Sequence, residues 1–107
     1  MRNLQLGQVK FAADQLVPIV VQDSQTKQVL MLAYANMEAL DKSIQTGQMH
    51  FFSRSRNQLW RKGETSGNVL MVESLSLDCD GDTVLAEVRP AGPTCHLGTT
   101  SCFEEAQ

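Results

Sequence analysis

The clearest structural signal in the chain is the run Val17-Pro18-Ile19-Val20-Val21-Gln22-Asp23, which is rich in β-branched residues and predicts a strand. Polar residues follow at 24–27, and a second apolar run occupies residues 28–34. Two strand-like runs joined by a short polar segment predict a β-hairpin.

One helix is predicted directly after this hairpin. Asn36 is a residue type that caps helix N-termini, and Met37, Leu40 and Ile44 follow at the spacing of one buried helical face. Gly47 stands where a glycine commonly ends a helix. We therefore expect about ten residues of helix, close to the average length in globular proteins.

The remaining pattern predicts strands at residues 49–53, 58–61, 69–77 and 83–89. Glu73 interrupts the apolar face of the third of these strands, so we expect a bulge near it. Asp80-Gly81 predicts a hairpin turn between the last two strands. Together these elements predict an α+β fold: a β-rich single domain over residues 1–107, with one main helix and a core at about 17–103.

Composition excludes several classes of protein. The chain has 107 residues, 42% hydrophobic and 20% charged, which suits one packed domain and excludes a disordered acidic tail. A net charge of −3 argues against general nucleic-acid binding. No apolar run approaches the ~20 residues of a membrane span, and the N-terminus lacks the apolar stretch of a signal peptide. We expect a cytoplasmic protein without membrane or nucleic-acid partners.

The three cysteines, Cys79, Cys95 and Cys102, all lie in the last third of the chain. An odd number without an export signal argues against a disulfide framework, and leaves buried thiols, nucleophiles or metal ligands. Cys95 and Cys102 could reach one Zn²⁺ from a glycine-containing loop, with Cys79 as a third ligand and a position left for water. Alternatively, His96 could close a structural zinc site, or the thiols could bind no metal.

Cations are concentrated beside an aromatic residue and a polar loop: Arg54, Arg56, Trp60, Arg61, Lys62 and the loop 63–68. Guanidinium groups and loop hydroxyls of this kind suit an anion such as phosphate. The alternative is a solvated hairpin with its arginines on the wet face.

Three carboxylates at alternate positions, Asp78, Asp80 and Asp82, form a hard-oxygen cluster that suits Mg²⁺. If the strand stays regular there, Cys79 points to the opposite face. The alternative is an acidic hairpin turn without a metal. His50, in a predicted strand, is a further site candidate. The alternative is a histidine at the edge of the core with no part in the site.

In combination these segments resemble the phosphoribosyl-AMP cyclohydrolases, which act in the third step of histidine biosynthesis. The matching stretches cover about residues 17–103: Val29-Leu30-Met31-Leu32-Ala33-Tyr34, Phe52-Ser53-Arg54-Ser55-Arg56, Leu59-Trp60, Lys62-Gly63-Glu64-Thr65-Ser66-Gly67, Asp78-Cys79-Asp80 with Asp82, Gly92-Pro93-Thr94-Cys95-His96 and Ser101-Cys102-Phe103. Because the chain ends shortly after Phe103, we expect the monofunctional form, without a fused pyrophosphohydrolase domain.

The resemblance implies an intertwined homodimer with each active site at the interface. Zn²⁺ would be bound by Cys79 of one subunit with Cys95 and Cys102 of the other, and Mg²⁺ by the three aspartates. The 54–67 segment would hold the nucleotide, which gives as candidate substrate-binding residues Arg54, Arg56, Trp60, Lys62, Thr65 and Ser66. Candidate proton carriers are His96, then Glu64 and His50.

The reaction implied is zinc-dependent hydrolysis of the C6–N1 bond in the adenine ring of 1-(5-phosphoribosyl)-AMP, giving the formimino-carboxamide ribotide. Two alternatives stay open: a zinc-stabilised nucleotide-binding module without turnover, and a zinc nucleotide deaminase.

Overall fold

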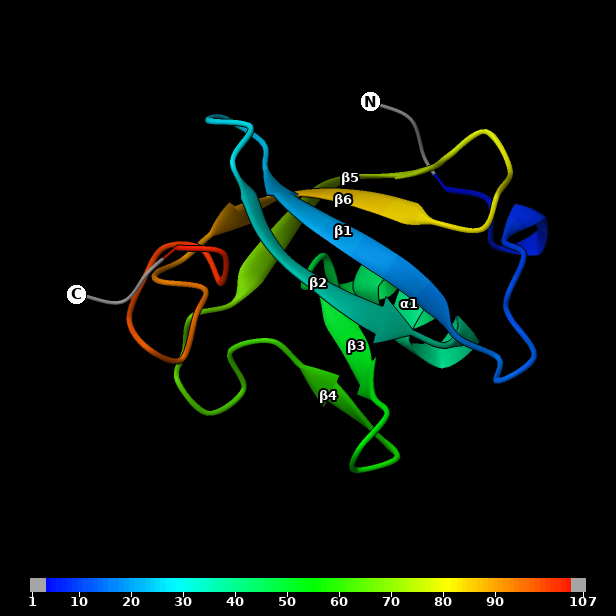
Figure 1. Ribbon diagram of the computed structural model, residues 1–107, viewed down its shortest axis with the longest axis horizontal. Coiled ribbons are helices and arrows are strands. Elements are labelled where there is room, and N and C mark those ends of the chain that lie inside the picture. The colour runs from blue at the N-terminus through cyan, green and yellow to red at the C-terminus, as the bar shows by residue number, and fades with distance from the viewer. Residues whose placement is uncertain (1–3, 105–107) are drawn as a thin grey trace.

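The computed structural model describes residues 4–104 and places the predicted hairpin in a four-stranded sheet (Figure 1). The order of strands is β2 (Val29–Ala35), β1 (Val17–Asp23), β6 (Val84–Pro90) and β5 (Leu70–Leu77). The β1–β2 and β5–β6 pairs are antiparallel, as the two predicted hairpins require. The central pair, β1 with β6, is parallel, and the sequence pattern gave no sign of it.

Three further elements complete the fold: a short 3₁₀ helix, η1 (Leu6–Gln8), the helix α1 (Met37–Thr46) and a two-stranded sheet of β3 (His50–Ser53) and β4 (Gln58–Arg61). The chain is therefore the predicted β-rich α+β domain with one main helix. Met1, Arg2 and Asn3, part of the N-terminal stretch used above to argue against a signal peptide, lie outside the described residues. Within residues 4–104, no helix has the length and apolar character needed to cross a bilayer.

The helix begins and ends where the sequence predicted. The side chain of Asn36 accepts a hydrogen bond from the Ala39 amide at 2.9 Å, and Gly47 ends the helix in the left-handed conformation at φ 75°. The predicted buried face is wrong for Met37 and Ile44, which are each 46% exposed.

The helix instead buries a face of small residues around Leu40, because β3 approaches it closely. Ala39 and Ser43 are fully buried beside Leu40. The Ser43 hydroxyl donates to the Ala39 carbonyl at 2.8 Å and accepts from the His50 amide at 2.8 Å. The bond with the His50 amide joins α1 to β3 and needs a short side chain at position 43.

The core lies between the sheet and the layer formed by α1 and β3. Alternate residues of β1 and β6, such as Ile19 and Val84, are fully buried on this side. The predicted bulge in β5 is confirmed by a register shift between Val72 and Ser74.

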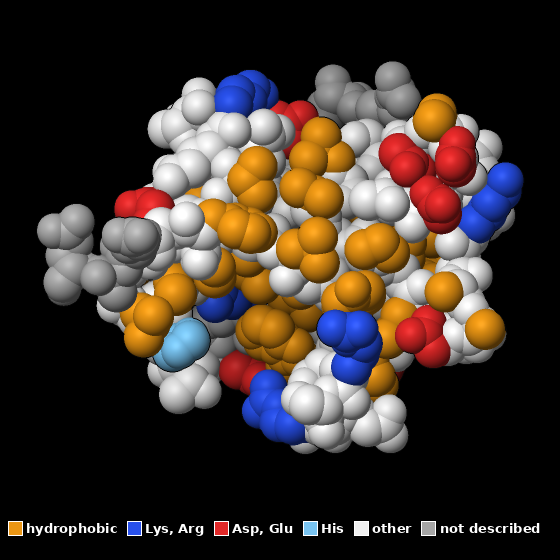
Figure 2. Space-filling view, in the orientation of Figure 1, with side chains coloured by type: hydrophobic (Ala, Val, Ile, Leu, Met, Phe, Trp, Pro, Cys, Tyr) orange, Lys and Arg blue, Asp and Glu red, His pale blue; other side chains and the backbone are white. Residues whose placement is uncertain are grey.

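Within residues 4–104, no layer covers the opposite face of the sheet. Leu32 of β2 is 49% exposed there and pairs with Val20 of β1, which pairs in turn with Leu85 of β6. Figure 2 shows hydrophobic side chains gathered over this face.

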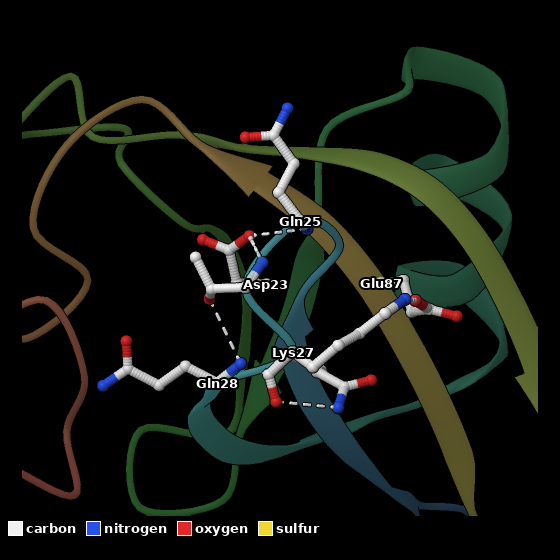
Figure 3. Close-up of polar contacts among 7 residues, drawn as sticks. Asp23, Gln25, Lys27, Gln28 and Glu87 are labelled. Atoms are coloured by element: carbon white, nitrogen blue, oxygen red, sulfur yellow. Dashed lines mark hydrogen bonds and ion pairs between the residues drawn. The ribbon is translucent and has the colours of Figure 1, made fainter.

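The turn between β1 and β2 is held by polar contacts (Figure 3). Asp23 accepts from the amides of Gln25 at 2.8 Å and Thr26 at 3.1 Å, and Lys27 forms an ion pair with Glu87 at 2.6 Å. These bonds fix the start of β2, on which the C-terminal loop rests.

Candidate active site

The loop after β6 carries two of the three cysteines and is fastened to β2. The Cys102 amide donates to the Leu30 carbonyl at 2.7 Å, and the Ser101 hydroxyl donates to the Val29 carbonyl at 2.6 Å. Within the loop, the Cys95 amide donates to the Thr99 carbonyl at 3.2 Å. These bonds bring the Cys95 and Cys102 thiols into contact with each other.

The surroundings of Cys95 favour its thiolate. Hydrogen bonds from the Leu97 amide and the Thr99 hydroxyl lower the pKa of Cys95, and the thiol of Cys102 and the charge of Lys62 add to this against the effect of burial. Burial and the neighbouring Cys95 raise the pKa of Cys102, while Lys62 opposes them. One thiol of the pair is therefore prepared to ionise first, as a metal ligand must.

Cys79 lies at the opposite end of β6, in the turn between β5 and β6 (Figure 1). The seven residues of β6 separate this turn from the loop of Cys95, and a strand of that length spans roughly 20 Å. Among residues 4–104, no three His, Cys, Asp or Glu side chains of one chain form a group that could hold a metal ion.

Cys79 was expected to point away from the carboxylates only if the strand stayed regular, and this condition is not met, because β5 ends at Leu77 and the turn begins immediately after it. The Cys79 thiol donates to the Asp80 carboxylate at 3.1 Å. This bond, with burial and the charge of Asp78, raises the pKa of Cys79.

The three aspartates share this turn. Burial acts to raise the pKa of Asp78, but hydrogen bonds from Asp82 and from backbone amides outweigh it and lower the pKa. The hydrogen bond with Asp78 raises the pKa of Asp82, helped by burial and by the charges of Asp78 and Asp80. Asp78 and Asp82 therefore behave as a pair in which one carboxyl keeps its proton longer than the other.

The N-terminal segment completes this turn, which the sequence did not predict. The Lys10 amide donates to the Gly81 carbonyl at 2.7 Å, and a Cβ at Gly81 would lie 3.1 Å from the Gln8 carbonyl oxygen. A cavity of about 340 Å³ lies here, lined by Leu4, Gln5, Gln8, Lys10, Ser76, Leu77, Asp78, Cys79, Asp80 and Gly81.

A second cavity, of about 290 Å³, lies at the other end of the sheet. It is lined by Lys62, Ser66, Asn68, Pro93, Thr94, Cys95, His96 and Gly98. It joins the predicted substrate loop to the predicted metal loop, two segments that are about thirty residues apart in sequence. Of its lining residues, the sequence had indicated Lys62, Ser66, Cys95 and His96 as individual candidates; Asn68 was included only as the end of the polar loop 63–68, and Thr94 only as part of a stretch that matches the family.

Close backbone packing holds the two loops together. At Gly63, φ is 87° and a Cβ would lie 2.5 Å from the Val69 nitrogen. At Gly92, a Cβ would lie 2.4 Å from the Asn68 side-chain oxygen. The loop 63–68 therefore packs on itself at Gly63 and rests on the backbone of the metal loop through Asn68.

The other predicted substrate residues surround the β3–β4 hairpin. The Arg54 guanidinium lies 3.9 Å from the ring centre of Tyr34, and Trp60 packs on Phe51 with ring centres 5.2 Å apart. Lys62 lies 5.8 Å from the Trp60 ring centre. Arg56, Glu64 and Thr65 are exposed and do not line the cavity of Cys95.

His50 is not brought to this cavity. It is 9% exposed in β3, and its Nδ1 lies 2.8 Å from the Gln48 carbonyl oxygen. Its proposed part in proton transfer stays a prediction, whereas His96 is exposed and lines the cavity next to Cys95.

Comparison with known proteins gives a consistent picture. A sequence model of the family described as phosphoribosyl-AMP cyclohydrolase matches residues 31–104, which contain all the candidate site residues. A Vibrio vulnificus (strain CMCP6) protein named "Histidine biosynthesis bifunctional protein HisIE" is 60% identical over 91 residues, 85% of this chain and 43% of that protein. A Staphylococcus aureus (strain Mu50) protein of the same name is 58% identical over 88 residues, 82% of this chain and 42% of that protein. The chain thus spans less than half the length of these relatives.

Proposed function

The chain belongs to the phosphoribosyl-AMP cyclohydrolase family, and from this membership we propose that it hydrolyses the adenine ring of 1-(5-phosphoribosyl)-AMP. The product is the formimino-carboxamide ribotide, an intermediate of histidine biosynthesis, the pathway for which the relatives are named.

Water adds to C6 of the ring in this reaction, and the C6–N1 bond then breaks. N1 gains a proton, the oxygen of water becomes the carbonyl oxygen of a carboxamide, and the exocyclic nitrogen is retained. No ammonia leaves, which distinguishes the reaction from deamination.

The observation that carries the proposal is the placement of the thiols. Cys95 and Cys102 lie together beside one cavity, and Cys79 lies beside another at the far end of β6. We propose that two copies of the chain associate so that the Cys79 turn of one meets the Cys95 loop of the other. The uncovered apolar face of the sheet supports such an association, because a face of this kind on a monomer would be exposed to water.

The donor set fits zinc. Three thiols are soft ligands, and the lowered pKa of Cys95 favours the ionised form that a metal requires. Cys95 and Cys102 of one chain and Cys79 of another would hold the zinc, which would supply a water molecule of lowered pKa as the nucleophile at neutral pH.

The chain's own residues then bind the nucleotide and move protons. Lys62 and Ser66 place a cation and a hydroxyl in the cavity beside Cys95, where they suit a substrate phosphate. Arg54, Arg56 and Trp60, on the adjacent hairpin, offer guanidinium groups and an aromatic surface for the rest of the substrate. We propose His96, which lines the cavity next to Cys95, as the group that transfers the proton to N1.

The acidic turn is proposed as the Mg²⁺ site. Asp78, Asp80 and Asp82 lie within one exposed turn, where Asp78 and Asp82 already compete for a proton. A hard cation would relieve the repulsion between these carboxylates.

Ring opening is followed by ultraviolet absorbance in protein as purified, after chelation and after restoring zinc. We expect the protein as purified to be active, the chelated protein to be inactive and the zinc-restored protein to be active again, with no release of ammonia. Ammonia release would instead identify a deaminase. Nucleotide binding without turnover in the zinc-loaded dimer would identify a binding module.

A further inference from the structure

The Thr94 hydroxyl stands out among the buried polar groups. Thr94 is 1% exposed, and its Oγ1 is the sole buried side-chain nitrogen or oxygen within residues 4–104 that lacks a hydrogen-bond partner. Burying a hydroxyl without a partner is unfavourable, so such groups are uncommon in native proteins and indicate a missing ligand or solvent molecule.

Thr94 also lines the cavity of about 290 Å³ next to Cys95. The other polar side chains of this lining are Lys62, Ser66, Asn68 and His96, together with the Cys95 thiol, and no carboxylate is among them. A cavity with a cation, hydroxyls and an amide but no carboxylate suits an anion. Its volume is at the low end for pockets that hold whole small molecules, so it suits one end of a larger ligand.

The backbone around this cavity is fixed before any ligand binds. The Thr94 amide donates to the Thr100 carbonyl at 3.2 Å, and the Lys62 amide donates to the Met49 carbonyl at 3.1 Å. Asn68 rests against Gly92. Rotation of the Thr94 side chain about its Cα–Cβ bond, from one staggered rotamer to another, would exchange the positions of its methyl and hydroxyl groups.

We propose that this cavity receives a phosphomonoester of the nucleotide and that the Thr94 hydroxyl, turned into the cavity, donates a hydrogen bond to a phosphate oxygen beside Lys62. The inference rests on the proposed function, because it takes the nucleotide as the ligand, and it adds Thr94 as a substrate-binding residue next to the metal loop.

Binding of AMP and of adenosine by the purified protein tests the proposal, using calorimetry with wild type, Thr94→Val and Thr94→Ser. Wild type should bind AMP more tightly than adenosine. Thr94→Val, which keeps the shape but removes the hydroxyl, should weaken AMP binding about 10-fold, the effect of one hydrogen bond to a charged group, and leave adenosine binding unchanged. Thr94→Ser should bind AMP like wild type, as should the control Thr100→Val, which changes an exposed threonine of the same loop.

The melting temperature of the ligand-free protein separates a binding role from a structural one. Because the hydroxyl has no partner, Thr94→Val should melt at or above the wild-type temperature. A lower melting temperature that Thr94→Ser restores would overturn the proposal, as would equal losses of AMP and adenosine binding, or no preference for AMP in wild type. These probes are not hydrolysed, so a failure to open the substrate ring would leave this result standing.

Discussion

Cys79 precedes β6 and Cys95 follows it, so the two thiols lie at opposite ends of one seven-residue strand. A rigid central strand of a sheet cannot fold back to bring its ends together. Any metal site that uses both residues must therefore take them from two chains, and this geometry makes the proposed dimer testable.

Mixing inactive variants should restore part of the activity. A mixed dimer of one Cys79→Ser chain and one Cys102→Ser chain keeps one intact site. The Cys102→Ser chain supplies its wild-type turn to that site, and the Cys79→Ser chain supplies its wild-type loop. Random mixing makes half of the dimers mixed, so about a quarter of the sites should recover. Ring opening after co-refolding measures this recovery.

The control for this experiment is a mixture of Cys95→Ser and Cys102→Ser. Both substitutions damage the same loop, so no arrangement of two chains gives an intact site, and no activity should return. Equal recovery in both mixtures, or none in either, would contradict a site shared in this way.

Asp82→Asn should stabilise the metal-free protein at neutral pH. The hydrogen bond with Asp78, then burial and the charges of Asp78 and Asp80, raise the pKa of Asp82. A group whose pKa is raised by folding stabilises the fold below its unfolded pKa, near 4, and this contribution is lost as the pH rises through the folded pKa. Wild type should therefore lose more stability than the variant between pH 4 and pH 7 in chelator.

Thermal unfolding of both proteins over this range measures the difference. Added Mg²⁺ should raise the melting temperature of wild type more than that of Asp82→Asn. Asp41→Asn, which removes a half-buried helix carboxylate that accepts a hydrogen bond from Gln45, controls for net charge. An equal response of all three proteins to Mg²⁺ would count against the aspartates as ligands.

The strands and the helix were predictable because their signals are local. β-Branched and apolar runs located β1 and β2, the alternation of residues 83–89 located β6, and Asn36 and Gly47 located the ends of the helix. The parallel pairing of β1 with β6 has no local signal, since these strands are far apart in sequence. The buried face of the helix was also mispredicted, because the close approach of β3 selects Ala39 and Ser43 over the larger Met37 and Ile44.

The candidate site likewise divides into residues that the sequence could indicate and residues that it could not. Residue type and spacing indicated Lys62 and Cys95, whose chemistry is visible in the sequence. Asn68 and Thr94 carry no such signal, because their importance depends on a glycine backbone that lies against Asn68 and on a hydroxyl left without a partner. These are consequences of two distant loops meeting and can be read only in three dimensions.

Gly63→Ala should destabilise the substrate loop more than Gly67→Ala does. Both glycines have positive φ, at 87° and 80°, which costs about 1–2 kcal/mol for a residue with a Cβ. At Gly67 nothing lies within 4 Å of the added Cβ, whereas at Gly63 it would lie 2.5 Å from the Val69 nitrogen. Urea unfolding should therefore give a loss at Gly63 that exceeds the loss at Gly67 by about 1 kcal/mol or more. Equal losses of unfolding free energy in the two variants would mean that the loop at Gly63 relaxes around the added Cβ at no cost in stability.

Cys95 should ionise at lower pH than Cys79 in the zinc-free protein. The Leu97 amide, the Thr99 hydroxyl, Cys102 and Lys62 lower the pKa of Cys95, whereas the bond to Asp80, with burial and the charge of Asp78, raises the pKa of Cys79. Alkylation rates measured against pH by peptide mass spectrometry give a midpoint for each thiol that is independent of its accessibility. The midpoint of Cys95 should lie below the ordinary thiol value of about 8.5, and that of Cys79 above it.

Lys62→Met tests one contribution to this difference, the charge of Lys62. Removing the cation should move the midpoint of Cys95 upward and leave that of Cys79 unchanged, because Lys62 and the acidic turn lie at opposite ends of the sheet. If both midpoints moved together, the effect would be one of overall charge. A shift of Cys95, and of Cys102 with it, but not of Cys79 would mean that Lys62, besides suiting a phosphate, lowers the pKa of the two thiols beside it, so that zinc displaces fewer protons when it binds.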